Sequence, residues 1–139
     1  MQNLVPKKEE EERRLKALAE YRILGTKPES CYDDITKIAA STCNVPISLM
    51  TLVDRDKQWF KSKVGLEISE TRRDWSFCTH AIKESTPLIV SDAFQDARFV
   101  NNPLVKGDPQ IRFYAGFPLR NSEGNKLGTL CVIDRKPGN

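Results

Sequence analysis

The chain has 139 residues, of which 39% are hydrophobic and 29% are charged, and its formal net charge is +3. These values are typical of one globular domain and exclude a disordered or fibrous protein. The apolar runs reach about eight residues, whereas a membrane-spanning helix needs about 20. Acidic residues are interspersed among the basic ones, so the charge does not require nucleic acid or an anionic membrane as a partner.

The N-terminus carries no recognisable secretory leader, and we expect a cytoplasmic protein. The cysteine pattern agrees with that location. The four cysteines are dispersed without a Cys-x-x-Cys pair, and three of them lie inside apolar stretches. Reduced, buried thiols fit this pattern better than a disulfide framework. The positions concerned are Cys31, Cys43, Cys78 and Cys131.

The N-terminal segment predicts an amphipathic helix. Its run KKEEEERR places acids before arginines, which suits the helix dipole and permits ion pairs one turn apart. Gly25 is well placed to end the helix, and one face carries Leu15, Leu18, Ala19 and Arg22. Two interpretations stay open: a solvated helix with one apolar stripe, or a helix that dimerises or transmits a signal.

A second helix and a hairpin are predicted next. Ser30 and Asp33 resemble a capping box, and the helical face that follows consists of Tyr32, Ile35, Ile38, Ala39 and Thr42. The segment ISLMTLVD, from Ile47 to Asp54, is apolar on both sides, which indicates a central strand covered on both faces. The charged turn DRDK joins it to a second strand, Gln58 to Gly65.

The segment Leu66–Asp74 is polar and irregular, and a helical pattern returns in the octet WSFCTHAI. This octet predicts a helix over Trp75–Lys83 that keeps His80, the single histidine, off its apolar stripe. A strand is expected at Pro87–Ala93, followed by a loop with one helical turn around Phe99. Two long strands joined by the turn NSEGNK close the chain.

The predicted order is helix, helix, strand, strand, helix, strand, loop, strand, strand. Two hairpins separated by a helical crossover favour an α+β fold, with an antiparallel sheet of five or six strands and helices on both faces. Helices from the segments near the termini should lie on one face and the Trp75–Lys83 helix on the other. The interior strands should include Ile47–Val53, Ile111–Leu119 and Leu127–Ile133.

Motifs for catalysis, metals and cofactors are missing from the sequence. It has no glycine-rich phosphate loop, no local set of four zinc ligands and no Cys-x-x-Cys-His for haem. Cys78 and His80 would be the nucleophile and base, but residues two apart on a helix point roughly 200° apart and cannot pair. The strand RFYAGF has the aromatics of an RNA-binding strand without its second-position glycine, so a core strand is the better interpretation. We expect no catalytic residues, no metal, no cofactor and no nucleic-acid partner.

Taken in order, these segments resemble the GAF family, the small sensory domains of bacterial signalling proteins. The resemblance extends from Glu10 to Arg135 and is carried by RLKALAEYRILGT, VPISLMTLVDRDKQWFKSKVGL, SFCTHAI, PLIVSDAFQDARFVNNPLVKG and IRFYAGFPLRNSEGNKLGTLCVIDRKP. It implies a linker helix over residues 1–25, the GAF domain over 26–135 and the start of an exit linker over 136–139.

Departures from the family pattern disfavour three of its subgroups. Bilin-binding members place a cysteine immediately before the helix histidine, where this chain has Thr79. Cyclic-nucleotide-binding members carry N-K-x-F-x-D-E, and the segment NKLG at Asn125 begins like this signature and then fails. Members that reduce free methionine sulfoxide use loop cysteines, a pattern that the cysteines here do not match. We therefore expect a non-bilin sensor.

The resemblance also implies a ligand cavity beside the octet helix. We predict a site lined by Trp75, Phe77, His80, Phe99, Arg112 and Tyr114. Arg112 and Tyr114 are two apart on one strand, so they would share a face and offer polar anchors. A small planar or acidic metabolite would suit such a site. The alternative is a cavity filled by side chains.

We accordingly expect a non-enzymatic input domain of a larger signal-transduction protein, a histidine kinase, nucleotide cyclase or diguanylate cyclase with its effector domain downstream. A homodimer is expected, in which Leu15, Leu18 and Arg22 meet their symmetry mates or the second helix. The alternatives are a stand-alone thiol enzyme, such as a free methionine sulfoxide reductase, and a ligand-free dimerisation scaffold.

Overall fold

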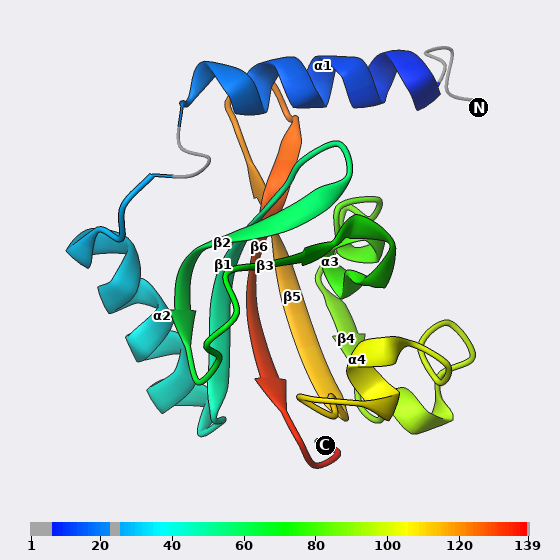
Figure 1. The fold of residues 1–139 in the computed structure, drawn as a ribbon. Coiled ribbons are helices and arrows are strands. Elements are labelled where there is room, and N and C mark those ends of the chain that lie inside the picture. Colours follow the sequence, from blue (N-terminus) through cyan, green and yellow to red (C-terminus); the bar gives the residue numbers. More distant parts are fainter. Residues whose placement is uncertain (1–6, 23–25, 139) are drawn as a thin grey trace.

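The computed structural model describes residues 7–22 and 26–138, which form one antiparallel sheet with helices around it (Figure 1). The helices are α1 (Lys7–Glu20), α2 (Ser30–Cys43), α3 (Phe77–Ala81) and α4 (Pro103–Lys106), with short 3₁₀ helices η1 (Arg73–Trp75) and η2 (Ala93–Gln95). The strands are β1 (Ile47–Val53), β2 (Lys57–Val64), β3 (Glu70–Arg72), β4 (Leu88–Val90), β5 (Phe113–Arg120) and β6 (Lys126–Asp134).

The six strands lie in the order β3-β2-β1-β6-β5-β4, and every hydrogen-bonded pair is antiparallel. The predicted α+β sheet is therefore confirmed, with β1, β6 and β5 inside it as expected. All seven residues of the interior strand β1 are buried, including Leu49 and Met50 on its opposite faces. A strand apolar on both sides needs such cover.

Two helices cover one face of the sheet. Thr36 of α2 hydrogen-bonds Ser62, the strand partner of Met50, at 2.8 Å. Helix α1 crosses the ends of the strands (Figure 1) and buries Leu18 against Leu52 and Leu127. Helix α3 lies on the other face, where Phe77, Cys78 and Ala81 pack in the main hydrophobic core. The expected distribution of helices over both faces is confirmed.

Local boundaries differ from the sequence predictions where a polar residue interrupts a pattern. The predicted helix at Trp75–Lys83 is divided, because Ser76 is extended and caps α3 by accepting a hydrogen bond from the Thr79 amide. Ser30 is the first residue of α2 and not its cap, and Asp33 accepts a bond from Ser62 instead.

Two short elements were missed in the sequence. The segment predicted to be irregular contains β3, a strand of three residues that is too short to leave a sequence pattern. The helical turn expected around Phe99 is present, since the amides of Phe99 and Val100 donate to the Asp96 carbonyl at 3.0 and 2.9 Å. The sequence missed α4, which begins at Pro103 after the capping residue Asn102. The first helix ends at Glu20 and so excludes Arg22, whereas Gly25, its predicted end, lies outside the described residues. No described helix is long and apolar enough to cross a membrane.

Candidate functional site

The predicted ligand site contains packed aromatic rings. Phe77 and Phe99 stack with centroids 4.0 Å apart and planes 8° apart, and Tyr114 lies 5.1 Å from the Phe77 ring. None of the three is more than 2% exposed. Gly116 leaves room for the tyrosine, since a Cβ there would lie 2.1 Å from the Tyr114 hydroxyl. These side chains fill the space between α3 and the sheet.

A buried polar cluster lies beside these rings. The Cys78 sulfur is 3.0 Å from the Thr129 hydroxyl and 3.3 Å from the Tyr114 hydroxyl, and Thr51 bonds Thr129 at 3.0 Å. Burial raises the pKa of the Cys78 thiol, but hydrogen bonds led by those from Cys131 and Thr129 outweigh it and lower the pKa. Burial raises the pKa of Tyr114 well above its ordinary value.

The thiols divide into two pairs. Cys78 and Cys131 are buried, whereas Cys31 and Cys43 are exposed on α2. The expectation of buried thiols is therefore correct for one pair and wrong for the other, because the outer face of α2 has no cover among the described residues.

The remaining predicted site residues lie at the edge of the aromatic core. His80 meets the Phe99 ring edge-on at 4.9 Å, and its pKa is lowered by burial and then by the charge of Lys83. Trp75 is half-buried and packs against the core. His80 and Cys78 thus have separate partners, in agreement with the argument against a catalytic pair.

Arg112 and Tyr114 do not provide free polar anchors. The Arg112 guanidinium donates to the carbonyl oxygens of Val105 and Ile111 at 2.9 and 3.0 Å, and it stacks on the Phe94 ring at 3.6 Å. Tyr114 instead reaches the Cys78 sulfur. The structure therefore brings Phe77, Phe99, His80 and Tyr114 together, but leaves Arg112 on separate contacts.

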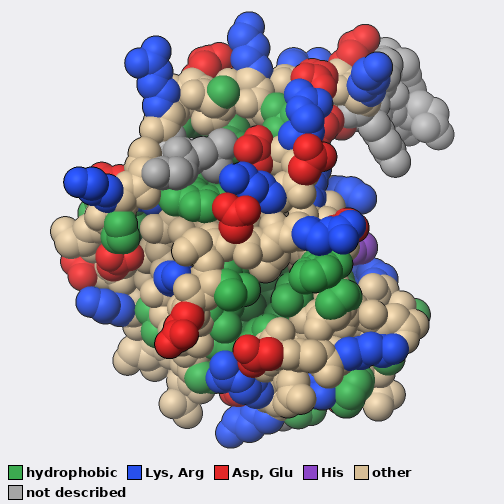
Figure 2. All heavy atoms as spheres, viewed as in Figure 1, with side chains coloured by type: hydrophobic (Ala, Val, Ile, Leu, Met, Phe, Trp, Pro, Cys, Tyr) green, Lys and Arg blue, Asp and Glu red, His purple; other side chains and the backbone are tan. Residues whose placement is uncertain are grey.

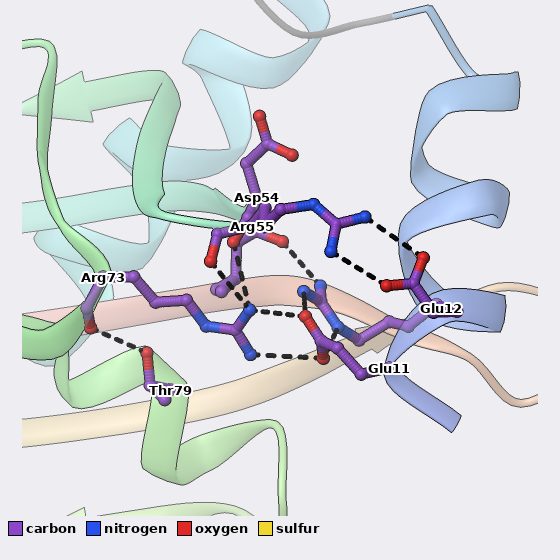
Figure 3. Close-up of polar contacts among 8 residues, drawn as sticks. Glu11, Glu12, Asp54, Arg55, Arg73 and Thr79 are labelled. Carbon is purple, nitrogen blue, oxygen red and sulfur yellow. Dashed lines mark hydrogen bonds and ion pairs between the residues drawn. The ribbon is translucent and has the colours of Figure 1, made fainter. Parts of the chain in front are cut away.

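A second polar site, which the sequence did not predict, joins α1 to the rest of the chain (Figure 3). We call Glu11, Arg14 and Arg73 the Glu11 cluster. The Glu11 carboxylate accepts from Arg14 Nε and Nη2 at 3.0 and 2.9 Å, and from both terminal nitrogens of Arg73, with Nη2 at 3.2 Å. Such bidentate pairs between a guanidinium and a carboxylate are strong and directional.

The two arginines extend the Glu11 cluster into the fold. Arg14 is only 6% exposed and donates to the Val53 carbonyl at 2.6 Å, at the end of β1. Arg73 Nη1 donates to the carbonyls of Asp54 and Arg55, while its own carbonyl accepts from the Thr79 hydroxyl of α3 at 2.9 Å. One carboxylate of α1 is thereby connected to β1, η1 and α3.

The electrostatics of Glu11 follow from this geometry. Burial raises the pKa of the Glu11 carboxyl, but hydrogen bonds from Arg14 and Arg73, helped by their charges, lower it to about 2. The carboxylate is therefore ionised at neutral pH. A second ion pair, Arg55 with Glu12, is exposed on both sides and is weak by comparison.

A cleft of about 680 Å³ lies next to the Glu11 cluster, between α1, the residues after α3 and the β5–β6 turn. Figure 2 shows acidic and basic side chains intermixed over α1 and directly below it. The cleft is lined by Glu10, Glu11, Arg13, Arg14, Arg73, Ile82, Lys83, Glu123, Gly124, Asn125 and Lys126. No group of three potential metal-binding side chains occurs within residues 7–22 and 26–138.

Part of the Glu11 cluster could have been found in the sequence. Glu11 and Arg14 are three apart on a predicted helix, which is a spacing for ion pairs. Arg73 lies 62 residues away in a segment predicted to be irregular, and no local pattern connects the two.

Comparisons with known proteins agree with this architecture. A family model described as GAF domain matches residues 27–139. The chain is 42% identical over 132 residues to a cyclic di-GMP phosphodiesterase of Pseudomonas aeruginosa, and this alignment covers 95% of the chain and 22% of that protein.

Two solved structures have a similar fold. The type II free methionine-R-sulfoxide reductase of Thermoplasma acidophilum has a TM-score of 0.63 at 13% identity, covering 87% of this chain and 79% of that one. The GAF domain of an Acinetobacter phosphoenolpyruvate-protein phosphotransferase has a TM-score of 0.61 at 14% identity, covering 100% and 82%. At such identities the likeness concerns the fold alone.

Proposed function

This chain belongs to the GAF domain family, and from that premise we propose that it is the regulatory input domain of a larger signal-transduction protein. The observation that carries the proposal is the Glu11 cluster, which connects α1 to β1, η1 and α3 through partly buried ion pairs and hydrogen bonds. Because α1 is held in this way, a movement of α1 can alter the conformation of the domain, and a conformational change in the domain can move α1.

We propose that the larger protein acts in cyclic di-GMP turnover. The support is the Pseudomonas aeruginosa relative, which is named as a cyclic di-GMP phosphodiesterase and of which this chain covers only 22%. The effector domain would then make or hydrolyse this nucleotide, while the present chain regulates it. A histidine kinase stays a second candidate for the effector.

A chimera tests the proposal. The aligned segment of the Pseudomonas aeruginosa phosphodiesterase is replaced by this chain, and cyclic di-GMP hydrolysis is measured with the intact domain and with Arg73→Gln. Because the substitution removes the η1 side of the Glu11 cluster, we expect the rate to change about fivefold or more, as is typical of coupling between sites.

The neighbouring residue provides the control. Arg72 pairs with Asp74 in an exposed ion pair and takes no part in the Glu11 cluster, so Arg72→Gln should leave the rate unchanged. Equal rates for the two variants, or no effect of deleting the domain, would contradict a regulatory role through this cluster.

The predicted ligand site is retained as a proposal that now requires side-chain movement. Phe77, Phe99 and Tyr114 occupy the space that a ligand would need, so a ligand there must displace at least one ring. Thermal-shift screening against aromatic acids tests it. A binder unaffected by both His80→Ala and Arg112→Ala would place the site elsewhere, and a screen without binders would favour a ligand-free scaffold.

We propose that the chain itself is not an enzyme. The alternative, a thiol-dependent reductase, would need an accessible cysteine pair. Cys78 and Cys131 are buried, and Cys31 and Cys43 lie near opposite ends of α2, about 18 Å apart at 1.5 Å per residue. Incubation with free methionine-R-sulfoxide and dithiothreitol should give no methionine above the protein-free rate. Turnover that is lost in Cys78→Ser would overturn this proposal.

We also propose a homodimer, with a changed contact surface. Leu15 and Leu18 are buried within the chain itself, so they are not available for the contact expected from the sequence. Ile35 and Ile38 of α2 are 43% and 65% exposed and share a face. Sedimentation at tens of micromolar should give a dimer, and Ile38→Asp should give a monomer. A strictly monomeric wild-type chain would defeat the proposal. A cytoplasmic location stays a prediction.

A further inference from the structure

We infer that the cleft between α1, the residues after α3 and the β5–β6 turn binds a small anion carrying at least two negative charges, a phosphate or a carboxylate compound. The cleft has a volume of about 680 Å³, which lies in the range of 300–1,000 Å³ usual for small-molecule sites. It is separate from the aromatic core beside α3, where the sequence predicted a ligand.

The charges around the cleft favour an anion. Its lining contains five cationic side chains and three carboxylates. One carboxylate, that of Glu11, is already shared by Arg14 and Arg73. The remaining charged side chains are the cations of Arg13, Lys83 and Lys126 and the carboxylates of Glu10 and Glu123, so the cations are still in excess.

These three cations come from three different parts of the fold. Arg13 belongs to α1, Lys83 follows α3, and Lys126 begins β6. Among the described residues, none of the three forms an ion pair with a carboxylate within 4.0 Å. Their ammonium and guanidinium groups are therefore available to a ligand with several acceptor oxygens.

The surroundings of Lys126 do not fully compensate its positive charge. Burial and then the charge of Arg120 lower the pKa of the Lys126 ammonium, and the attraction of Glu84 and Glu10 does not compensate. An anion in the cleft would oppose this effect because it stabilises the charged form. Ile82 adds an apolar side chain to the lining, so the ligand can carry a short carbon frame.

An anion bound by all three cations would connect α1 with α3 and β6. It would therefore favour the docked position of α1, which the Glu11 cluster already stabilises. This consequence rests on the proposed role of α1 in signalling, whereas binding of the anion does not.

Calorimetric titration with pyrophosphate and with citrate tests the site, using the 139-residue chain at low ionic strength. We expect at least one of the two to bind, and Lys83→Gln or Lys126→Gln to weaken the binding about tenfold, because each substitution removes a charge-assisted hydrogen bond to the anion. The matched control is Lys106→Gln, which removes an exposed lysine of α4 outside the cleft and should bind like the wild type.

The outcomes separate the two proposals. Binding of pyrophosphate alone identifies a phosphate compound, and binding of citrate alone a carboxylate compound. Absence of binding by both anions at millimolar concentration, or equal binding by all three variants, overturns the anion site. Amide hydrogen exchange over α1 is then measured with and without the bound anion. Slower exchange supports the link to signalling, and unchanged exchange refutes that link while the site itself stands.

Discussion

Replacing Glu11 by glutamine removes the charge that joins α1 to η1 while it keeps the size of the side chain. Glutamine offers Arg14 and Arg73 one acceptor oxygen in place of two and carries no negative charge, so the buried Arg14 guanidinium keeps its bond to the Val53 carbonyl but loses its counter-ion. A buried charge that loses its partner destabilises the folded state. We expect Glu11→Gln to lower the free energy of unfolding.

The size of the effect follows from the pKa of Glu11. Its fall from 4.5 to about 2 corresponds to an upper limit of about 3.4 kcal/mol, at about 1.4 kcal/mol per unit. The Glu11 side chain is 30% exposed, and solvent screening reduces this limit to about 2 kcal/mol. For a domain of this size the thermal midpoint should fall by about 5–10 °C.

Urea unfolding at pH 7, followed by circular dichroism, measures the change. The matched control is Glu12→Gln, the same substitution at the next position of α1, which removes only the exposed pair with Arg55. Its midpoint should stay at the wild-type value. If the two variants unfold at the same urea concentration, the Glu11 cluster does not hold α1 to the domain.

Three further predictions concern pH, α1 packing and thiols. The folded-state pKa of Glu11 lies below its unfolded value, so unfolding takes up a proton between pH 4.5 and about 2. The difference in unfolding free energy between the wild type and Glu11→Gln should therefore be complete above pH 4.5 and disappear towards pH 2. Urea titrations across this pH range measure it. Leu18→Ala should cost about 2–4 kcal/mol in the same assay, because Leu18 is buried on the sheet; a negligible cost would mean that α1 is only a linker. A maleimide reagent should label Cys31 and Cys43 in the native chain and reach Cys78 and Cys131 only after unfolding, and rapid labelling of Cys78 would contradict the packed core.

The arrangement of the sheet could be predicted because its central strands leave strong local patterns. Every residue of β1 is buried, and its sequence is apolar on both sides. The polar turn between two long apolar segments likewise predicts the β5–β6 hairpin. The edge strand β3 left no such signal, since three residues paired with β2 do not establish a period.

The position of α1 could not be predicted for a different reason. An apolar stripe containing Leu15 and Leu18 fits a partner helix as well as it fits a sheet. The structure resolves the choice because Leu52, Leu127 and the half-buried Trp59 offer an apolar surface at the end of the sheet. That surface forms only when strands distant in the sequence come together.

The proximity of four predicted site residues could be foreseen, whereas their role as a ligand site stays a prediction. Phe77, Phe99, His80 and Tyr114 are neighbours, as the resemblance implied. Whether a cavity remains among them depends on how the rings pack, and a sequence does not carry that volume. The Glu11 cluster needs Arg73 to approach α1 from a distant segment, so only the fold reveals it.

Amide hydrogen exchange over α1 tests the central claim most directly. If the Glu11 cluster couples α1 to η1 and α3, then Arg73→Gln should speed exchange in residues 7–20 while α2 keeps its wild-type rates. Arg72→Gln, which alters only the exposed pair with Asp74 and the contact with Trp75, should leave α1 unchanged. Equal protection of α1 in the two variants would contradict the coupling on which the proposed regulatory function depends.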